Sequence, residues 1–160
     1  MPFLNEEKHQ IGCCAFNSRL LYAFGGAKKK RFVDTVERYD TFHNEGWQII
    51  QPTAVEGWSE RTNLGCAQID QQSILVFGGV VNDLEGWKKD FSFSLLYNVK
   101  LNVFESTPSD MIHPEREFFN CGPPRLQDSK FYAIDSEEQV NIFDSLTKTW
   151  SFALGKEEED

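Results

Sequence analysis

The chain has 160 residues, of which 40% are hydrophobic and 14% aromatic, and its formal net charge is −9. This length allows one domain, and the aromatic content is sufficient for a β-rich core. The acidic balance argues against nucleic acid as the main partner, because phosphate binding needs an excess of Lys and Arg. No run reaches the roughly 18 apolar residues of a membrane span, and residues 1–7 lack the basic start and apolar core of a secretory signal.

Residues 1–8 are expected to be a loose lead-in, followed by strands near residues 11–16, 20–24, 33–39 and 46–50. The second strand is an apolar run that ends in Gly25 and Gly26. A glycine pair permits positive φ angles and lets another segment pack against bare backbone. Residues 17–19 and 41–45 are short polar connections typical of hairpins.

The same pattern returns 53 residues later (78 − 25 = 53), where Gly78 and Gly79 follow a second apolar run. Cys13 and Cys66 precede their glycine pairs by the same interval (25 − 13 = 12; 78 − 66 = 12). A fixed period of this kind indicates an internal repeat. The second unit is expected to have strands near residues 65–69, 74–77, 93–98 and 103–106, with a long connection over residues 79–91.

A third, degraded unit has Asp135 and Ser136 in place of the glycine pair. Its strands are expected near residues 118–121, 130–134, 140–144 and 150–153. Prolines mark the link before this unit and a turn or bulge after its first strand. The repeat domain is therefore residues 1–155, with units at 9–52, 61–107 and 115–153, and residues 156–160 form an acidic tail.

The glycine pairs, the "VERYD" and "NIFD" strands and the aromatic residue near the end of each unit resemble the kelch repeat of β-propellers. The resemblance implies an all-β fold of three four-stranded antiparallel blades. The residues that match the motif are Gly25, Gly26, Tyr39, Trp47, Gly78, Gly79, Tyr97, Phe143 and Trp150. The third unit departs from the family by lacking its glycines, and the second has Phe104 where the family prefers Trp.

Three blades do not close a ring, because propellers need about four to eight. The propeller is therefore expected to be incomplete or completed by a partner, with one apolar face uncovered on each outer blade. The chain pairs with a second copy, docks against other blades in cis or trans or against a large assembly, or belongs to a longer kelch protein. A partner or assembly is favoured, because nothing in the sequence specifies a two-fold joint.

Antiparallel strands place the long connections, over residues 27–32, 51–60, 80–90 and 107–115, at one end of the blades. Loops on a rigid scaffold concentrate binding residues, and Trp and Arg are favoured anchors. The expected partner-binding residues are Lys28, Lys29, Lys30, Arg31, Trp58, Arg61, Trp87, Lys88, Lys89 and Arg116. In the alternative interpretation, residues 28–31 are a solvated turn and both Trp side chains pack onto their own blades.

The four cysteines, Cys13, Cys14, Cys66 and Cys121, lie in the expected innermost strands, where buried free thiols are favoured over a metal or redox cluster. The chain has no Cys-x-x-Cys spacing, and its histidines lie outside those strands. No metal site or cofactor is therefore predicted. No spacing ties Ser, His and Asp into a catalytic set, so an enzyme is not expected.

The resemblance implies a non-catalytic protein–protein interaction module, such as a subunit or scaffold part of a larger cytoskeletal or ciliary assembly. Protein partners, acidic or cytoskeletal, are expected rather than nucleic acid or membrane. The cysteine pattern fits a reducing compartment such as the cytoplasm. Two alternatives stay open: the substrate-recognition propeller of a ubiquitin-ligase adaptor, and a metal-dependent enzyme of the kelch-like oxidase type.

Overall fold

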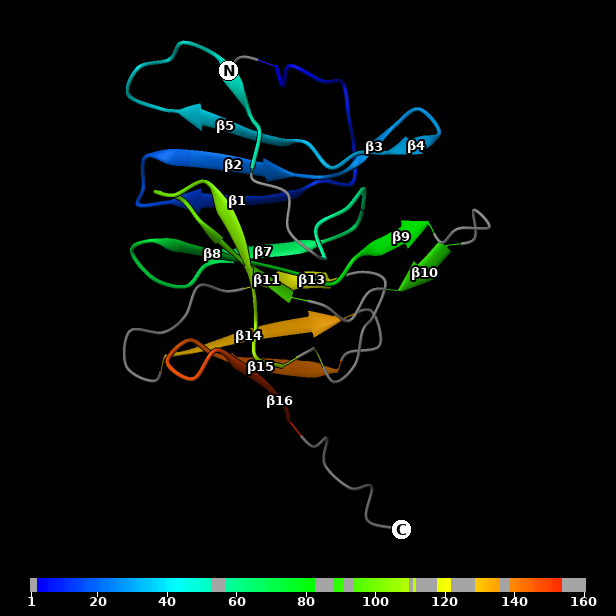
Figure 1. Cartoon of the computed structure of the whole chain (residues 1–160), viewed down its shortest axis with the longest axis vertical. Coiled ribbons are helices and arrows are strands. Elements are labelled where there is room, and N and C mark those ends of the chain that lie inside the picture. The colour runs from blue at the N-terminus through cyan, green and yellow to red at the C-terminus, as the bar shows by residue number, and fades with distance from the viewer. Residues whose placement is uncertain are drawn as a thin grey trace.

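The computed structural model describes residues 3–52, 57–82, 88–90, 94–109, 111, 118–121, 129–135 and 139–153. These residues form β-strands and no helix, and every strand pairing among them is antiparallel. The predicted all-β class is therefore confirmed for this part of the chain. Three four-stranded sheets follow one another from the N-terminus to the C-terminus, and two small hairpins project from one end (Figure 1).

Each four-stranded sheet is formed within one predicted repeat unit, with its strands in chain order. Sheet 1 contains β1 (Gly12–Phe16), β2 (Leu20–Phe24), β5 (Val36–Asp40) and β6 (Trp47–Ile50). Sheet 2 contains β7 (Gly65–Gln68), β8 (Ser73–Phe77), β11 (Ser94–Asn98) and β12 (Val103–Ser106). Sheet 3 contains β13 (Phe118–Cys121), β14 (Lys130–Asp135), β15 (Val140–Asp144) and β16 (Thr149–Phe152). These strands confirm the twelve expected positions, with small differences at their ends.

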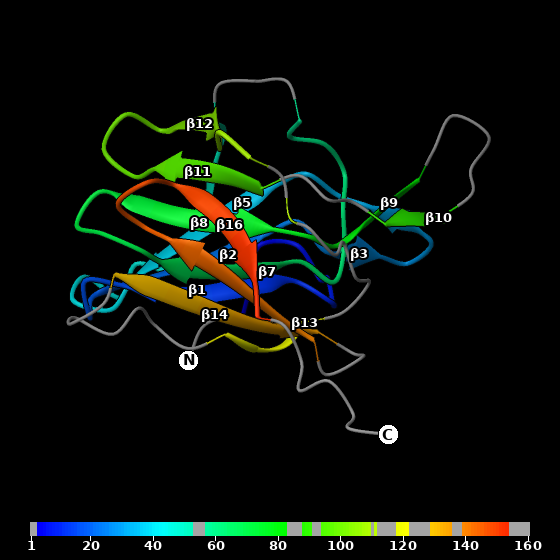
Figure 2. The ribbon, with the colours of Figure 1, turned by 90° about the horizontal axis from the view of Figure 1, so that it is seen from below.

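The two small hairpins replace what the sequence predicts as long loops. They consist of β3 (Ala27–Lys28) with β4 (Arg31–Phe32), and of β9 (Val80–Asn82) with β10 (Lys88–Asp90). Both lie at the same end of the molecule, here called the hairpin end, and the short β-turns lie at the opposite turn end (Figure 2). The described parts of the connections at residues 27–32 and 80–90 therefore lie at one end, as expected, and they are partly ordered as strands.

The glycine pairs have the backbone conformation that their sequence positions predict. Gly25 and Gly26 have φ angles of 57° and 112°, and Gly78 and Gly79 have φ angles of 62° and 91°. After each pair the chain forms an isolated bridge to the residues before the first strand, His9↔Ala27 in unit 1 and Thr62↔Val80 in unit 2. The repeat thus extends beyond the sheets, since both bridges are 53 residues apart (62 − 9 = 53; 80 − 27 = 53).

The turn between the last two strands is built in the same way in all three units. A side-chain oxygen at the end of the third strand accepts backbone N–H bonds from the turn that follows, at Asp40, Asn98 and Asp144. The next residue bonds back to the first hairpin of its unit, as Thr41 N to Arg19 O (3.1 Å), Val99 N to Gln72 O (2.9 Å) and Ser145 N to Ser129 O (2.8 Å). Three sequences with different side chains therefore form one repeated structure.

An aromatic cross-strand pair also recurs in each sheet. Tyr39 opposes Trp47, Tyr97 opposes Phe104, and Phe143 opposes Trp150, with ring centroids 5.6, 5.1 and 5.1 Å apart. Such pairs stabilise a sheet by packing side chains on one face. Phe104 therefore occupies the position of the two Trp residues, as the sequence predicts.

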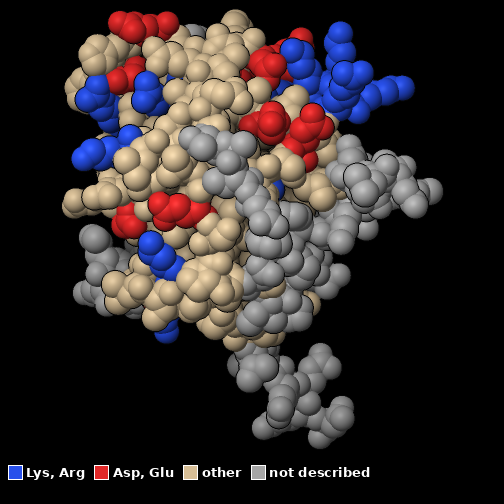
Figure 3. Space-filling model, in the orientation of Figure 1, with Lys and Arg blue, Asp and Glu red and all other residues tan. Residues whose placement is uncertain are grey.

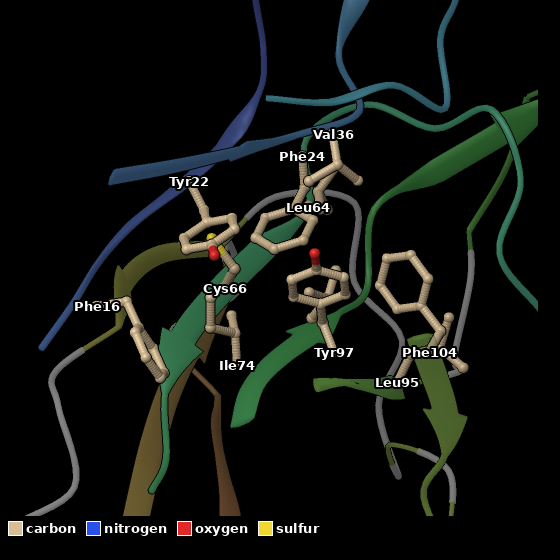
Figure 4. Close-up of a cluster of buried hydrophobic side chains, with 11 residues drawn as sticks. Phe16, Tyr22, Phe24, Val36, Leu64, Cys66, Ile74, Leu95, Tyr97 and Phe104 are labelled. Atoms are coloured by element: carbon tan, nitrogen blue, oxygen red, sulfur yellow. The ribbon is translucent and has the colours of Figure 1, made fainter. Parts of the chain in front are cut away.

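Two buried clusters join the three sheets. One lies between sheets 1 and 2 and contains Phe16, Tyr22, Phe24, Val36, Leu64, Cys66, Ile74, Val76, Leu95, Tyr97 and Phe104 (Figure 4). The other lies between sheets 2 and 3 and contains Ala67, Ile69, Leu75, Phe77, Leu96, Met111, Phe131, Ala133, Phe143 and Trp150. Sheet 2 is therefore covered on both faces by the rest of the chain, because its strands place alternate side chains in the two clusters.

Candidate protein-binding surface

The β3–β4 hairpin holds the basic run at residues 28–31 on an ordered support. Ala27 and Phe32 pair across the hairpin and are buried together with Val80 of β9. Lys29 adopts a φ angle of 57° in the turn. Because the apolar pair anchors the base of the hairpin, the charged side chains at its tip are held away from the core.

The four basic side chains of the hairpin are exposed: Lys28, Lys29, Lys30 and Arg31. Lys28 Nζ lies 3.6 Å from Glu6 Oε1, and for the other three the described residues provide no acidic partner within ion-pair distance. Figure 3 shows this group as a projecting cluster of Lys and Arg at the hairpin end. Concentrated positive charge in a chain of net charge −9 favours an acidic ligand at this place.

Trp58 packs into the molecule. Its ring stacks on Phe104 at a centroid distance of 4.4 Å and meets Phe24 edge-on at 6.3 Å, and its Nε1 donates to Asp34 O at 3.0 Å. For this residue the structure favours the interpretation in which the Trp packs onto the sheets rather than serving as an exposed anchor.

The sequence predicts that Arg61 belongs to an exposed binding surface. This prediction is wrong, because the Arg61 side chain is fully buried. Its Nε donates to Ser59 O at 3.2 Å, its guanidinium lies 4.9 Å from the centroid of Trp58, and it also donates to Gly57 O. Burial lowers the pKa of the Arg61 guanidinium to about 10. The backbone explains its position: Gly26 N donates to Arg61 O at 2.7 Å, which draws this segment between sheets 1 and 2.

The remaining predicted contact residues lie partly or wholly outside the described structure. Trp87 and Arg116 are outside the described residues. Lys88 and Lys89 lie in β10, opposite Asn82 and Val81, and only their backbone is described. Of the predicted surface, the structure therefore brings together the four residues of the β3–β4 hairpin.

The cysteines differ in their environment although they occupy equivalent strands. Cys66 is buried, Cys14 is half-buried and Cys13 is exposed, and all three are free thiols. The prediction that Cys13 is buried is therefore wrong, because its face of sheet 1 has no neighbouring sheet. Cys121 lies in β13, and its side chain is outside the described set. Within the described ranges, no three His, Cys, Asp or Glu residues cluster as metal ligands, and no helix is long and apolar enough to cross a membrane.

A buried ion pair was not predicted from the sequence. Lys8 Nζ lies 3.2 Å from Glu37 Oε1, both side chains are fully buried, and Lys8 Nζ also donates to Thr35 Oγ1 at 3.0 Å. The N-terminal segment thereby packs beside sheet 1, where Asn5 N donates to Glu37 Oε2 at 2.7 Å. The sequence does contain a signal for this position, because a basic residue precedes a cysteine by five residues in each unit. The pairs are Lys8 and Cys13, Arg61 and Cys66, and Arg116 and Cys121 (13 − 8 = 5; 66 − 61 = 5; 121 − 116 = 5).

A polar cluster at the turn end of sheet 1 was also missed. Asp40 accepts from Arg19 Nη2 at 2.6 Å, and His43 Nδ1 lies 2.9 Å from Asp40 Oδ2. Hydrogen bonds from Arg19 and His43 hold the pKa of the Asp40 carboxyl well below its usual range. A shallow depression beside it is lined by Arg38, Asp40, His43, Glu45, Gly46 and Gln48. It lies at the opposite end from the basic hairpin, so the two features do not form one site.

No protein-family model and no curated protein matches this sequence. Among the solved structures, 118 chains are similar to it. One of these, titled "Structure of YjhT", has a TM-score of 0.72 and 18% sequence identity, with the similarity covering 99% of this chain and 54% of that chain. At this identity the likeness shows the fold alone. The chain spans about half the length of that solved structure.

Proposed function

We propose that the protein is a non-catalytic protein-binding module whose three sheets are blades of a kelch-type β-propeller. The structural repetition described above supports the blade assignment: equivalent turns, aromatic pairs and glycine conformations recur in successive units. Its function is that of a scaffold part in a larger assembly, and the partner presents an acidic segment to the β3–β4 hairpin.

The observation that carries the binding assignment is the basic hairpin itself. Four consecutive basic residues are exposed on a hairpin whose base is buried, within a chain of net charge −9. A charged cluster on a rigid support raises the rate of association with an oppositely charged segment and selects against like-charged ones. The ion pair between Lys28 and Glu6 shows that a carboxylate already reaches this hairpin from within the chain.

Binding of a synthetic Glu- and Asp-rich peptide tests this proposal, with anionic lipid vesicles and duplex DNA as competing probes. The variant Lys28→Glu/Lys29→Glu/Arg31→Glu is expected to weaken peptide binding by about 10-fold or more, since each exposed charge contributes about 0.2–1 kcal/mol. The matched control is Lys100→Glu/Lys130→Glu/Lys148→Glu, which makes the same change in net charge at the turn end. The control is expected to change binding by less than about 2-fold, because salt screens distant charges.

Equal losses of peptide affinity in the two variants would mean that binding depends on the net charge of the protein rather than on this hairpin, and the assignment would fail. Tighter binding of vesicles or DNA than of the peptide would also overturn the assignment of an acidic protein segment.

A further inference from the structure

The carboxylate of Glu6 lies between two donors beside the β3–β4 hairpin. Its Oε2 accepts a hydrogen bond from Thr35 Oγ1 at 2.8 Å, and its Oε1 lies 3.6 Å from Lys28 Nζ. The two oxygens of one carboxylate are therefore held by different partners, a hydroxyl group and an ammonium group. The Glu6 side chain is 23% exposed and that of Lys28 is 46% exposed, so this contact is accessible from solvent.

The direction of the Thr35 hydrogen bond is fixed by a third group. Lys8 Nζ donates to Thr35 Oγ1 at 3.0 Å, and an ammonium group cannot accept. The single hydroxyl hydrogen of Thr35 therefore points away from Lys8, toward Glu6. Lys8 in turn is held by the carboxylate of Glu37 at 3.2 Å, and both of these side chains are fully buried. The hydroxyl group thus offers a donor to whatever group lies at the position of the Glu6 carboxylate.

The donor set defines the chemical class of the group that it binds. A hydroxyl hydrogen and an ammonium group both require an acceptor, and the ammonium charge favours an anion over a neutral amide. The spacing of the two donors suits the two oxygens of one carboxylate, as Glu6 itself shows. Acidic side chains lie directly beside the projecting basic cluster in Figure 3. Thr35 and Lys28 therefore have the properties of a carboxylate-binding subsite at the edge of the basic hairpin.

Glu6 is held at this subsite by bonds on both sides of it in the chain. Asn5 N donates to Glu37 Oε2 at 2.7 Å, and His9 pairs with Ala27 of β3 through backbone bonds of 3.0 and 2.8 Å. Because its neighbours are fixed, the Glu6 carboxylate reaches the donors without the loss of freedom that a separate ligand undergoes. Glu6 therefore competes with any external carboxylate as an intramolecular ligand.

We propose that Thr35 and Lys28 bind a carboxylate of the acidic partner, and that Glu6 occupies this subsite in the free chain and is displaced when the partner binds. The inference rests on the proposed function, because it names one contact that the acidic segment makes at the hairpin. The other three basic side chains of the hairpin are exposed and attract the segment, whose carboxylate then replaces that of Glu6. Glu6 thereby lowers the affinity of the hairpin for acidic segments.

Binding of the Glu- and Asp-rich peptide to the whole chain tests the proposal through two neighbouring variants. Glu6→Gln keeps the size of the side chain and an acceptor for Thr35, but it removes the charge that pairs with Lys28. It is expected to tighten peptide binding by about 3- to 10-fold, because displacing a neutral amide costs less than displacing a carboxylate. The matched control is Glu7→Gln, which makes the same change in net charge at an exposed position. A change of less than about 2-fold is expected for the control, because solvent and salt screen its charge.

A second comparison tests whether the peptide uses the same donors as Glu6. Thr35→Val removes the hydroxyl group and retains the shape of the side chain. In the Glu6→Gln background it is expected to weaken peptide binding at least about 2-fold more than in the wild type, because in the wild type it also weakens the bond of the competitor. If Thr35→Val does not fold, Lys28→Gln replaces it at a partly exposed position, and the same difference between backgrounds is expected.

Equal effects of Glu6→Gln and Glu7→Gln on peptide affinity would mean that only net charge matters, and would overturn the proposal. Equal effects of Thr35→Val in the two backgrounds would also overturn it, because the peptide would then not use this subsite. In either case, a wild type that binds the peptide through the hairpin leaves the proposed function intact. If neither the wild type nor Glu6→Gln binds the peptide, the proposed function fails and the subsite fails with it.

Discussion

Gly79 and Gly46 have similar backbone conformations and very different surroundings. Their φ angles are 91° and 94°, a region that side chains with a Cβ rarely adopt. A Cβ atom on Gly79 would lie 2.7 Å from Thr62 O, whereas one on Gly46 would have no neighbour within 4 Å. At Gly79 the contact also supports two backbone bonds between Thr62 and Val80, of 3.1 and 2.9 Å.

Alanine at these two glycines separates conformational strain from steric exclusion. Gly46→Ala is expected to cost about 1–2 kcal/mol in the free energy of unfolding, from the unfavourable φ angle alone. Gly79→Ala is expected to cost a further 1–3 kcal/mol or so, because the Thr62 backbone must move. Urea unfolding of the two variants measures the difference. If the two losses are equal, close backbone approach is not the reason for the second glycine pair.

At the residue scale, the sequence could show which residues occupy the same position in each repeat, but not whether their side chains are buried or what they contact. Cys13 and Cys66 have the same place in the repeat, yet only Cys66 is covered, because the neighbouring sheet comes from another unit. Lys8 and Glu37 are 29 residues apart (37 − 8 = 29), and their pairing depends on how the N-terminal segment packs beside sheet 1. Neither fact follows from local spacing.

The turn between β5 and β6 offers a test at the scale of one element. Asp40 accepts a backbone bond from Phe42 N at 2.9 Å, as Asn98 does from Lys100 N at 3.1 Å in the equivalent turn. The substitution Asp40→Asn therefore keeps this turn but removes the charge that pairs with Arg19. It is expected to lower the melting temperature at neutral pH.

The pH dependence of this loss follows from the pKa of Asp40. That pKa is lower in the folded protein than the value of about 3.9 expected in the unfolded chain. The ionised carboxylate therefore stabilises the fold fully above about pH 4. This contribution is lost as pH falls from about 4 toward the lower pKa that Asp40 has in the folded protein. Thermal unfolding of wild type and Asp40→Asn should converge in acid.

Asp144→Asn is the matched control for that experiment. The carboxylate of Asp144 accepts backbone bonds from Leu146 N at 2.8 Å and Thr147 N at 3.1 Å, which an Asn side chain also accepts. A smaller loss than at Asp40 is expected. If Asp40→Asn and Asp144→Asn lose the same stability at neutral pH, the Arg19 pairing contributes nothing measurable.

The strands of the three sheets were predictable because each is an apolar or alternating run between turn residues. The β3–β4 hairpin was not, since two-residue strands have no periodicity and the run at residues 28–31 has the composition of a solvated turn. What orders this hairpin is long-range packing of Ala27 and Phe32 with Val80. For the same reason the sequence could name the basic residues but not show that they stand on an anchored support.

At the scale of the whole molecule, sheet 2 differs from its neighbours because the chain itself covers both of its faces. Each face packs in one of the two buried clusters. Sheets 1 and 3 each bury one face within the chain and have part of the other exposed. Local opening requires less free energy where fewer apolar contacts are lost. The central claim is therefore that sheet 2 is the most stable of the three sheets, because the described residues cover both of its faces.

Amide hydrogen exchange along the chain tests this claim most directly. Strands β8 and β11 of sheet 2 are expected to be the most protected, and strands β2, β5, β14 and β15 are expected to exchange faster. Equal protection of all three sheets, or fastest exchange in sheet 2, would contradict the account.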